Sequence, residues 1–403
     1  LSLNRLELWG GPLGADHPRI KGITTEIDGT ISQNILSLNQ MKLQSSIANG
    51  SVRGKIAGQG QNQLEGSADI NLAEVFSQLP ETLNLRQDLT LSQGKLALSA
   101  SIQSTGEVTV FESNARIDKL KGRSKGKTVD WNQPISLKAR GERSAQGIRV
   151  DNLSLRSAFL NADGRGDFSN MRVTLSADVA AALRELKKFI DIKEWEGSGK
   201  LFGKLQINET APNISSANVN LDIRDLALIH NRAPILAKQD VKADLSTTVH
   251  KGEGLTARKF QQPNLTIQSS MVRGKFSATR IQLNPGERLP TAENLSIDGN
   301  FNLQQISDLL RKFKKLPHST RLAGTAHIRS SGSMDAQRFV LNSTRIDTRN
   351  FRYHDGEKAL SDDRLVLETE GKLNFETKSA RFAPITIDGS AGTITIPQLT
   401  IND

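Results

Sequence analysis

Residues 217–224 read Ala-Asn-Val-Asn-Leu-Asp-Ile-Arg, and this stretch decides the fold. Every second side chain is apolar, and every intervening one is Asn, Asp or Arg. Since successive side chains of a β-strand point to opposite faces of the sheet, the alternation predicts a strand with one apolar and one wet face. Strands of this kind are typical of antiparallel sheets.

The same alternation recurs in residues 95–102 and through most of residues 365–396. We expect its apolar positions to share one face of a sheet. These positions are Leu96, Leu98, Ile102, Val219, Leu221, Ile223, Leu365, Leu367, Phe375, Ile385, Ile387, Ile394 and Ile396. The chain is therefore predicted to be mainly β.

Three windows change to the apolar spacing of an amphipathic helix. They are residues 72–79, about 179–192 and about 303–316. Asn71, Asp178 and Asn302 stand before them as N-cap residues, and Pro80 and Pro317 follow the first and the third. We therefore expect about three short helices between groups of strands.

Each helical window is followed by a glycine that introduces a new alternating strand. Gly94, Gly199 and Gly324 come 22, 20 and 21 residues after the first helical residue, and the helix starts are 107 and 124 residues apart. This spacing predicts an internal repeat of several strands and one short helix. The predicted units are a partial repeat 1–71, helix-led repeats 72–178 and 179–302, and a partial helix-led repeat 303–403, joined in one continuous elongated unit.

Two arrangements can hide the apolar faces of such strands. Two sheets can close into a sandwich, or the repeats can continue as one twisted antiparallel sheet that curves into a groove. Aromatic residues are scarce, with 14 Phe, 3 Trp and 1 Tyr in 403 residues. Because thick cores consume large side chains, this composition favours the groove.

Composition also excludes several classes of site. The chain has no cysteine, so thiol catalysis, cysteine-ligated metals and disulfides are excluded, and its six histidines show no metal-ligand spacing. No catalytic or dinucleotide motif is present, so we expect neither an enzyme nor a cofactor. The net charge of +10 permits an anionic partner, but the basic residues are not interleaved with aromatic ones, and nucleic acid is not expected.

One segment concentrates positive charge. Its cations are Lys119, Lys121, Arg123, Lys125 and Lys127. If the segment is extended, it aims five cations at one side, where they could contact anionic lipid head groups. The favoured alternative is a solvated hairpin or loop, since the intervening residues include Gly and Ser.

The second and third helical windows carry basic pairs beside their apolar stripes. These pairs are Lys187-Lys188, Arg311-Lys312 and Lys314-Lys315. A helix lying in a membrane interface has this composition, and so does a helix that caps one end of a groove. We favour the cap, because each stripe is only about three turns long and needs a surface to bury it.

Taken together, these features resemble the AsmA/TamB-type proteins of the bacterial envelope and the wider repeating β-groove class that includes chorein-type bridge lipid-transfer proteins. The resemblance lies in glycine-led segments that run into a short helix and then into a glycine-led strand. It is carried by Gly164–Phe168, Asp178–Ile192 and Trp195–Gln206, with Gly299–Leu316 and Leu322–Ile328 as a second copy.

The resemblance implies a β-taco, whose interior groove holds the acyl chains of phospholipid or another lipid. It further implies non-enzymatic lipid transfer between inner and outer membranes, in the periplasm, with envelope proteins as partners. On this view the chain is a fragment of a longer protein that is anchored in the inner membrane by a segment outside it. The alternative function is a structural or adhesive β-repeat scaffold of the envelope without lipid cargo.

Overall fold

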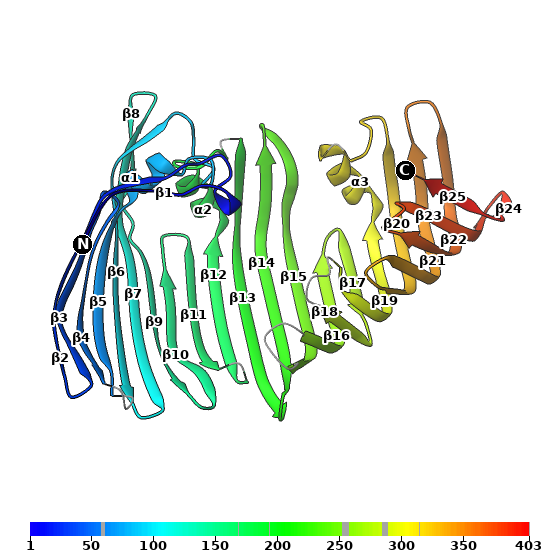
Figure 1. Ribbon diagram of the computed structural model, residues 1–403. Helices are drawn as coiled ribbons and strands as arrows, with labels where there is room; N and C mark the ends of the chain where they lie inside the picture. Colours follow the sequence, from blue (N-terminus) through cyan, green and yellow to red (C-terminus); the bar gives the residue numbers. More distant parts are fainter. Residues whose placement is uncertain are drawn as a thin grey trace. The chain divides into compact units, whose positions relative to one another are not determined.

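The computed structural model describes residues 1–57, 61–167, 169–192, 194–251, 258–283, 289–313 and 315–402. Phe168, Lys314 and Asp403, which belong to segments discussed above, lie outside this part. The described residues form three α-helices and 25 strands, and all the strands belong to one antiparallel sheet (Figure 1). The predicted fold class, a mainly β antiparallel sheet with about three short helices, is confirmed.

The chain divides into two compact units, Leu1–Ser198 (unit 1) and Gly199–Asp403 (unit 2). The elements of unit 1 are β1 (Ser2–Glu7), a 3-10 turn (Gly11–Leu13), β2 (Arg19–Ser32), β3 (Ile35–Gln44), β4 (Ala48–Ala57), β5 (Gln63–Asn71), α1 (Leu72–Gln78), β6 (Leu89–Thr105), β7 (Val108–Ser124), β8 (Lys127–Trp131), β9 (Ile135–Ser144), β10 (Gly147–Arg156), β11 (Leu160–Asp167), β12 (Met171–Asp178) and α2 (Val179–Leu186). The next strand, β13 (Trp195–Ala211), contains the boundary between the units.

Unit 2 continues with β14 (Ile214–His230), β15 (Ala233–Lys251), β16 (Arg258–Ser269), β17 (Val272–Ser277), β18 (Arg280–Leu283), β19 (Thr291–Asn302), α3 (Leu303–Lys312), β20 (Arg321–Met334), β21 (Arg338–His354), β22 (Ala359–Asn374), β23 (Ser379–Gly389), β24 (Gly392–Ile396) and β25 (Leu399–Asn402).

Neighbouring strands in the sequence are neighbours in the sheet. In unit 1, β1 to β7 pair in order, β7 then pairs with both β8 and β9, and β9 to β12 follow in order. In unit 2, the short strands β17 and β18 share the partners β16 and β19, and β19 to β23 pair in order. Each unit is thus a meander, in which most strands pair with their neighbours in the sequence.

The three helices begin where the sequence predicts. Asn71, Asp178 and Asn302 each accept a hydrogen bond at the side-chain Oδ1 from the backbone N–H three residues later, over 3.3, 2.8 and 3.0 Å. Such a bond satisfies one of the free N–H groups of a first helical turn.

α2 is shorter than the predicted window, which reached residue 192. It ends at Leu186, because the chain then turns to pair with the loop after α1. The Arg86 N–H donates to the Phe189 carbonyl over 3.0 Å, and Leu85 forms a β-bridge with Ile190. α3 likewise ends at Lys312, before the predicted limit of about 316.

The glycine after each helix lies opposite an irregularity in the next strand. A Cβ at Gly94 would stand 2.6 Å from Leu120 Cδ2 and 3.1 Å from Leu72 Cβ, and the register of β6 against β7 shifts beside it. Gly199 and Gly324 have φ angles of +134° and +101°, which favour glycine over residues with a Cβ. The repeated glycine therefore has a physical cause, which is close approach in one case and backbone conformation in the others.

The compact core of unit 1 lies at one end of its strands. Leu72, Leu120, Trp131 and Phe189 are buried there, and the Trp131 ring lies 5.6 Å from that of Phe189. In Figure 1, α1 and α2 lie at this same end, beside the β7–β8 hairpin. α1 contributes Leu72 and Phe76 to this core, and the chain around the end of α2 contributes Leu186 and Phe189. This part of the helical region thus caps one end of the sheet.

Candidate functional site: an apolar sheet face

Strand register brings the apolar positions of unit 1 into rows that cross the strands. Residues directly opposite one another in adjacent strands lie on the same face. One such row, from β3 to β9, consists of Leu43, Gly50, Ala68, Leu98, Ala115 and Leu137. The next row consists of Met41, Val52, Gly66, Ala100, Ser113 and Ala139. We call the face that carries these rows the apolar face of unit 1.

Large side chains on this face remain open to solvent. Leu43, Ile102 and Leu137 are 40%, 41% and 41% exposed, and Val52 and Leu153 are also exposed. A β-sandwich would bury such residues against a second sheet. Within the part of unit 1 that the structure describes, no second sheet covers them, because every described strand belongs to the same sheet.

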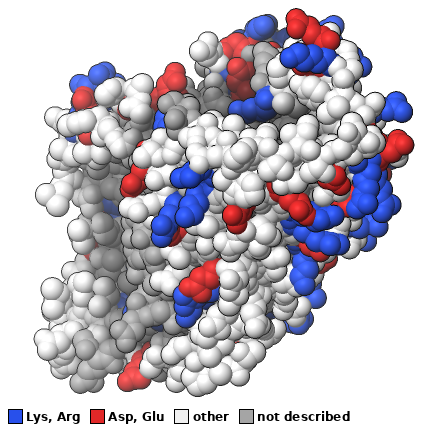
Figure 2. All heavy atoms as spheres, turned by 90° about the vertical axis from the view of Figure 1, so that its right-hand side faces the viewer, with Lys and Arg blue, Asp and Glu red and all other residues white. Residues whose placement is uncertain are grey.

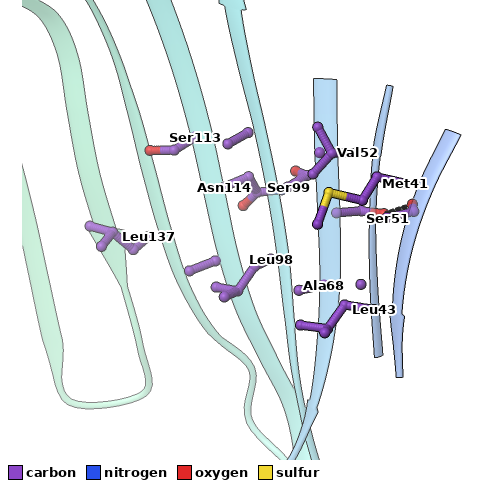
Figure 3. A pocket seen from close by; sticks show the side chains of 15 residues that line it. Met41, Leu43, Ser51, Val52, Ala68, Leu98, Ser99, Ser113, Asn114 and Leu137 are labelled. Carbon is purple, nitrogen blue, oxygen red and sulfur yellow. Dashed lines mark hydrogen bonds between the residues drawn. The ribbon is translucent and has the colours of Figure 1, made fainter. Parts of the chain in front are cut away.

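The residues of the two rows, apart from Ala139, line a hollow of about 550 Å³. Figure 3 shows Met41, Leu43, Leu98 and Leu137 around it, contributed by β3, β6 and β9. The floor between these side chains is made of small residues, among them Gly66 and the exposed Ala100. A hollow of this size is within the range of about 300–1,000 Å³ that is usual for ligand sites.

The opposite face of the same strands is polar. Arg53 and Glu65 pair there across β4 and β5 at 2.8 Å, and Lys95 pairs with Asp69 across β6 and β5 at 2.8 Å. These pairs are exposed, so they contribute little to stability. They do mark this face as the wet one.

Unit 2 repeats the arrangement with other residues. One row runs from β14 to β24 and consists of Leu221, Ala243, Ile267, Gly274, Gly299, Ile328, Ile346, Leu367, Ile387 and Ile394. Beside it lies a hollow of about 290 Å³, whose lining includes Leu245, Leu265, Phe276, Ile281 and Phe339. We call this the apolar face of unit 2.

The structure gives twelve of the thirteen predicted lining residues a place on these faces. Leu96, Leu98 and Ile102 lie on the apolar face of unit 1. The members in unit 2 are Val219, Leu221, Ile223, Leu365, Leu367, Ile385, Ile387, Ile394 and Ile396.

Phe375 is the exception, because β22 ends at Asn374. The Asn374 side chain accepts hydrogen bonds from the backbone N–H groups of Glu376 and Thr377, and this turns the chain. Sequence reasoning also missed Met41, Val52 and Phe276, since the registers that bring them to the hollows depend on distant strands.

The basic segment forms the β7–β8 hairpin, so its five cations do not share one side. Lys119, Lys121 and Arg123 alternate along β7 on one face, and Lys125 occupies the turn with a φ of +51°. Lys127 pairs with Ser124 and therefore faces the other side. The favoured alternative, a solvated hairpin, is what the structure contains.

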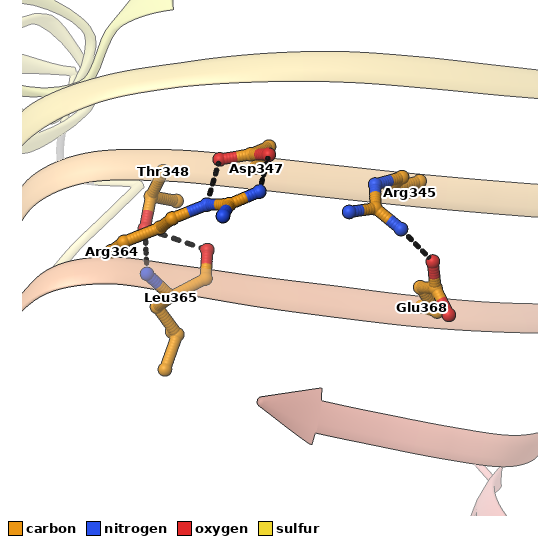
Figure 4. A network of polar contacts seen from close by, with 6 residues as sticks. All are labelled: Arg345, Asp347, Thr348, Arg364, Leu365 and Glu368. Atoms are coloured by element: carbon orange, nitrogen blue, oxygen red, sulfur yellow. Dashed lines mark hydrogen bonds and ion pairs between the residues drawn. The ribbon is translucent and has the colours of Figure 1, made fainter. Parts of the chain in front are cut away.

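The polar face of unit 2 contains a second kind of hollow, of about 520 Å³. In Figure 4, Arg364 donates to Asp347 over 2.9 Å, and Arg345 pairs with Glu368. The Arg364 hydrogen bond lowers the pKa of Asp347, and the same bond raises the pKa of Arg364. Figure 2 likewise shows basic and acidic side chains beside one another on the surface it presents. Both arginines of this hollow are paired with carboxylates, so it offers a ligand no unpaired cation. Asp388, which also lines it, accepts a hydrogen bond from Thr393 Oγ1 over 2.7 Å.

The described residues contain neither a metal-binding cluster nor a membrane-spanning helix. No group of His, Asp and Glu side chains there is placed to hold a metal ion. None of the helices in that part of the chain has the length and hydropathy needed to cross a membrane.

Comparison of the chain with protein-family models, with curated proteins and with solved structures yields no match. The resemblance to AsmA/TamB-type proteins therefore stays a prediction.

Proposed function

We propose that the apolar faces bind the acyl chains of lipids, and that the protein carries lipid between membranes without enzymatic activity. The observation that carries this proposal is the exposure of large apolar side chains, such as Ile102 and Leu137, in continuous rows on one face of the sheet. Monomeric proteins rarely expose apolar surface in contiguous patches of more than a few hundred Å² unless something binds there.

The chemistry of the hollow in unit 1 favours a hydrocarbon over a polar ligand. On its two rows of side chains only Ser113 carries a polar group, and no charged residue lines it. The other polar residues of its lining, Ser51, Ser67, Ser99 and Asn114, form a row of their own that alternates with these two and belongs to the opposite face. Each methylene that leaves water for such a surface contributes about 0.8 kcal/mol, so an acyl chain would gain several kcal/mol from a short length of contact. A lipid head group would find only the Ser113 hydroxyl on these rows and would remain in water.

The resemblance adds the expectation that the membranes are those of a bacterial envelope and that the cargo is phospholipid. These assignments belong to the proposal, as does the absence of enzymatic activity. The alternative function is a structural or adhesive scaffold that carries no lipid.

The test compares two neighbouring residues of β6 that face opposite sides. Ala100 lies on the apolar face and Ser99 on the polar face, and both are exposed, so an Asp at either position adds one charge at a similar cost to folding. We expect native mass spectrometry and solvent extraction to find lipid on the wild-type chain and on Ser99→Asp, and at least severalfold less on Ala100→Asp.

Circular dichroism would verify that both variants keep the sheet. A wild-type chain that is free of lipid after purification from membranes, and that takes up none from vesicles, would overturn the proposal. Equal amounts of lipid on Ser99→Asp and Ala100→Asp would exclude the apolar face of unit 1 as the binding surface.

A further inference from the structure

We propose that the β7–β8 hairpin is a docking element that holds the protein on an anionic lipid bilayer. Residues 119–127, which we call the basic tip, contain five cations and no carboxylate. All five side chains belong to described residues, and within that part of the chain none of them forms an ion pair or a side-chain hydrogen bond. The tip is thus a local concentration of unpaired positive charge.

The other repeats provide an internal comparison. The hairpin β14–β15 has the equivalent segment 225–233, with one Asp and one Arg, and the hairpin β21–β22 has 350–358, with two cations and two carboxylates. Asp225 pairs with Lys238 at 2.9 Å. Since the same structural element is neutral in two copies and carries five positive charges in the third, the hairpin fold does not itself require the cations.

The base of the hairpin is held rigidly. Leu120 and Trp131, which are opposite each other in β7 and β8, are each 5% exposed within the core of unit 1. Arg86 Nη2 donates to Ser124 Oγ over 2.7 Å and to Asp88 Oδ2 over 2.8 Å, and Ser124 Oγ donates to Asp88 Oδ2 over 2.7 Å. The hydrogen bond to Asp88 raises the pKa of Arg86. The backbone of the hairpin base is therefore already ordered, so little backbone entropy remains to be lost there when the tip meets a surface.

The composition and position of the basic tip indicate which class of partner it binds. Its intervening residues are Leu120, Gly122, Ser124 and Gly126, so it offers no aromatic ring on which a nucleic-acid base could stack. Figure 1 shows the hairpin extending past α1 and α2 at the end of unit 1. A flat anionic surface can contact several cations of such a projection at once. The choice of a bilayer over an acidic protein rests on the proposed lipid-carrying function.

The experiment measures vesicle binding of the full chain by co-sedimentation. One set of vesicles is pure phosphatidylcholine, and the other is a two-to-one mixture of phosphatidylcholine and phosphatidylglycerol. The test variant is Lys119→Gln/Lys121→Gln/Arg123→Gln. Its control, Lys42→Gln/Lys55→Gln/Lys138→Gln, removes three exposed and unpaired cations from other strands of unit 1.

We expect the wild-type chain to prefer the anionic vesicles and to lose that preference in high salt. Each cation near an anionic surface contributes about fivefold to partitioning at low salt, so the test variant should bind at least about tenfold more weakly, and the control should change far less. Lys119→Arg/Lys121→Arg, which keeps the charge, should bind like the wild type and so separates lost charge from lost folding.

Equal binding of the test variant and the wild type would overturn the proposal, as would equal losses in the test and control variants. The proposal would also be overturned if the test variant kept its vesicle binding but lost binding to single-stranded DNA or polyglutamate. The basic tip would then bind nucleic acid or an acidic protein and not a bilayer. The two proposals can fail separately. Ala100→Asp should lose bound lipid but keep vesicle binding, whereas the basic-tip variant should keep bound lipid but lose vesicle binding.

Discussion

At the scale of single residues, the packing around Gly94 gives a direct prediction. Gly94→Ala would place a methyl group 2.6 Å from Leu120 Cδ2 and 3.1 Å from Leu72 Cβ, and both neighbours are buried in the core of unit 1. Overpacking of this kind lowers the free energy of unfolding by about 1–3 kcal/mol. We therefore expect Gly94→Ala to unfold at a lower urea concentration than the wild type, as measured by tryptophan fluorescence.

Gly66→Ala is the matched control for Gly94→Ala. A Cβ at Gly66 in β5 meets its nearest neighbour, Val52 Cγ2, at an ordinary 3.4 Å, and the backbone there is extended. The free energy of unfolding of Gly66→Ala should differ from that of the wild type by less than about 1 kcal/mol in either direction. Equal shifts in the two variants would mean that the loss of glycine itself, and not the crowding at Gly94, decides the effect.

Residue-level reasoning from the sequence succeeded where a property depends on near neighbours. The alternation correctly assigned Leu221 to the apolar face, and the capping residue Asn302 correctly marked a helix start. It failed at Phe375, where a turn interrupts the alternation and changes which face a side chain meets. A period of two residues carries no information about where a strand stops.

At the scale of elements, Asp362 ties β22 to the turn between β23 and β24. Its carboxylate accepts hydrogen bonds from Arg364 N over 2.9 Å, from Ser390 N over 2.8 Å and from Ser390 Oγ over 2.9 Å. These bonds favour the ionised form, the largest effect being that of the Arg364 N–H, so the pKa of Asp362 is lowered in the folded state.

This lowered pKa predicts a pH-dependent role for Asp362. A carboxyl with a lower pKa folded than unfolded stabilises the fold above its unfolded pKa of about 3.9, and it loses that contribution as pH falls through the folded pKa. The difference in Tm between wild type and Asp362→Asn should therefore be greatest at neutral pH and shrink below about pH 4. A Tm difference for Asp362→Asn that stays constant with pH would contradict the prediction.

Elements were predictable to the extent that their signals are local. The starts of α1, α2 and α3 followed from their caps, but the end of α2 depends on pairing between Leu85 and Ile190, which are 105 residues apart in the sequence. The hollow in unit 1 needs the registers of six strands at once. Its small floor residues, such as Gly66 and Ala100, look unremarkable in the sequence, because their role appears only when the rows are aligned.

At the scale of the whole molecule, each unit has an apolar face with its own hollow, so the proposed function predicts additive lipid binding. Leu221→Asp, alone or with Ile223→Asp, places charge on the apolar face of unit 2 and leaves unit 1 unchanged. Its control is Asn218→Asp, on the other face of β14. Lipid per chain, counted by native mass spectrometry, should fall in part for Leu221→Asp, in part for Ala100→Asp, and almost completely when the two are combined.

The outcome also discriminates a groove from a closed core. Leu221 and Ile223 are half-buried, so Asp at these positions should leave the β-sheet signal in circular dichroism intact if the face is open to solvent. An unpaired carboxylate in a closed core would instead cost several kcal/mol and unfold unit 2. Unfolding of Leu221→Asp/Ile223→Asp alongside an intact Asn218→Asp would therefore favour a scaffold with a packed interior over a lipid carrier.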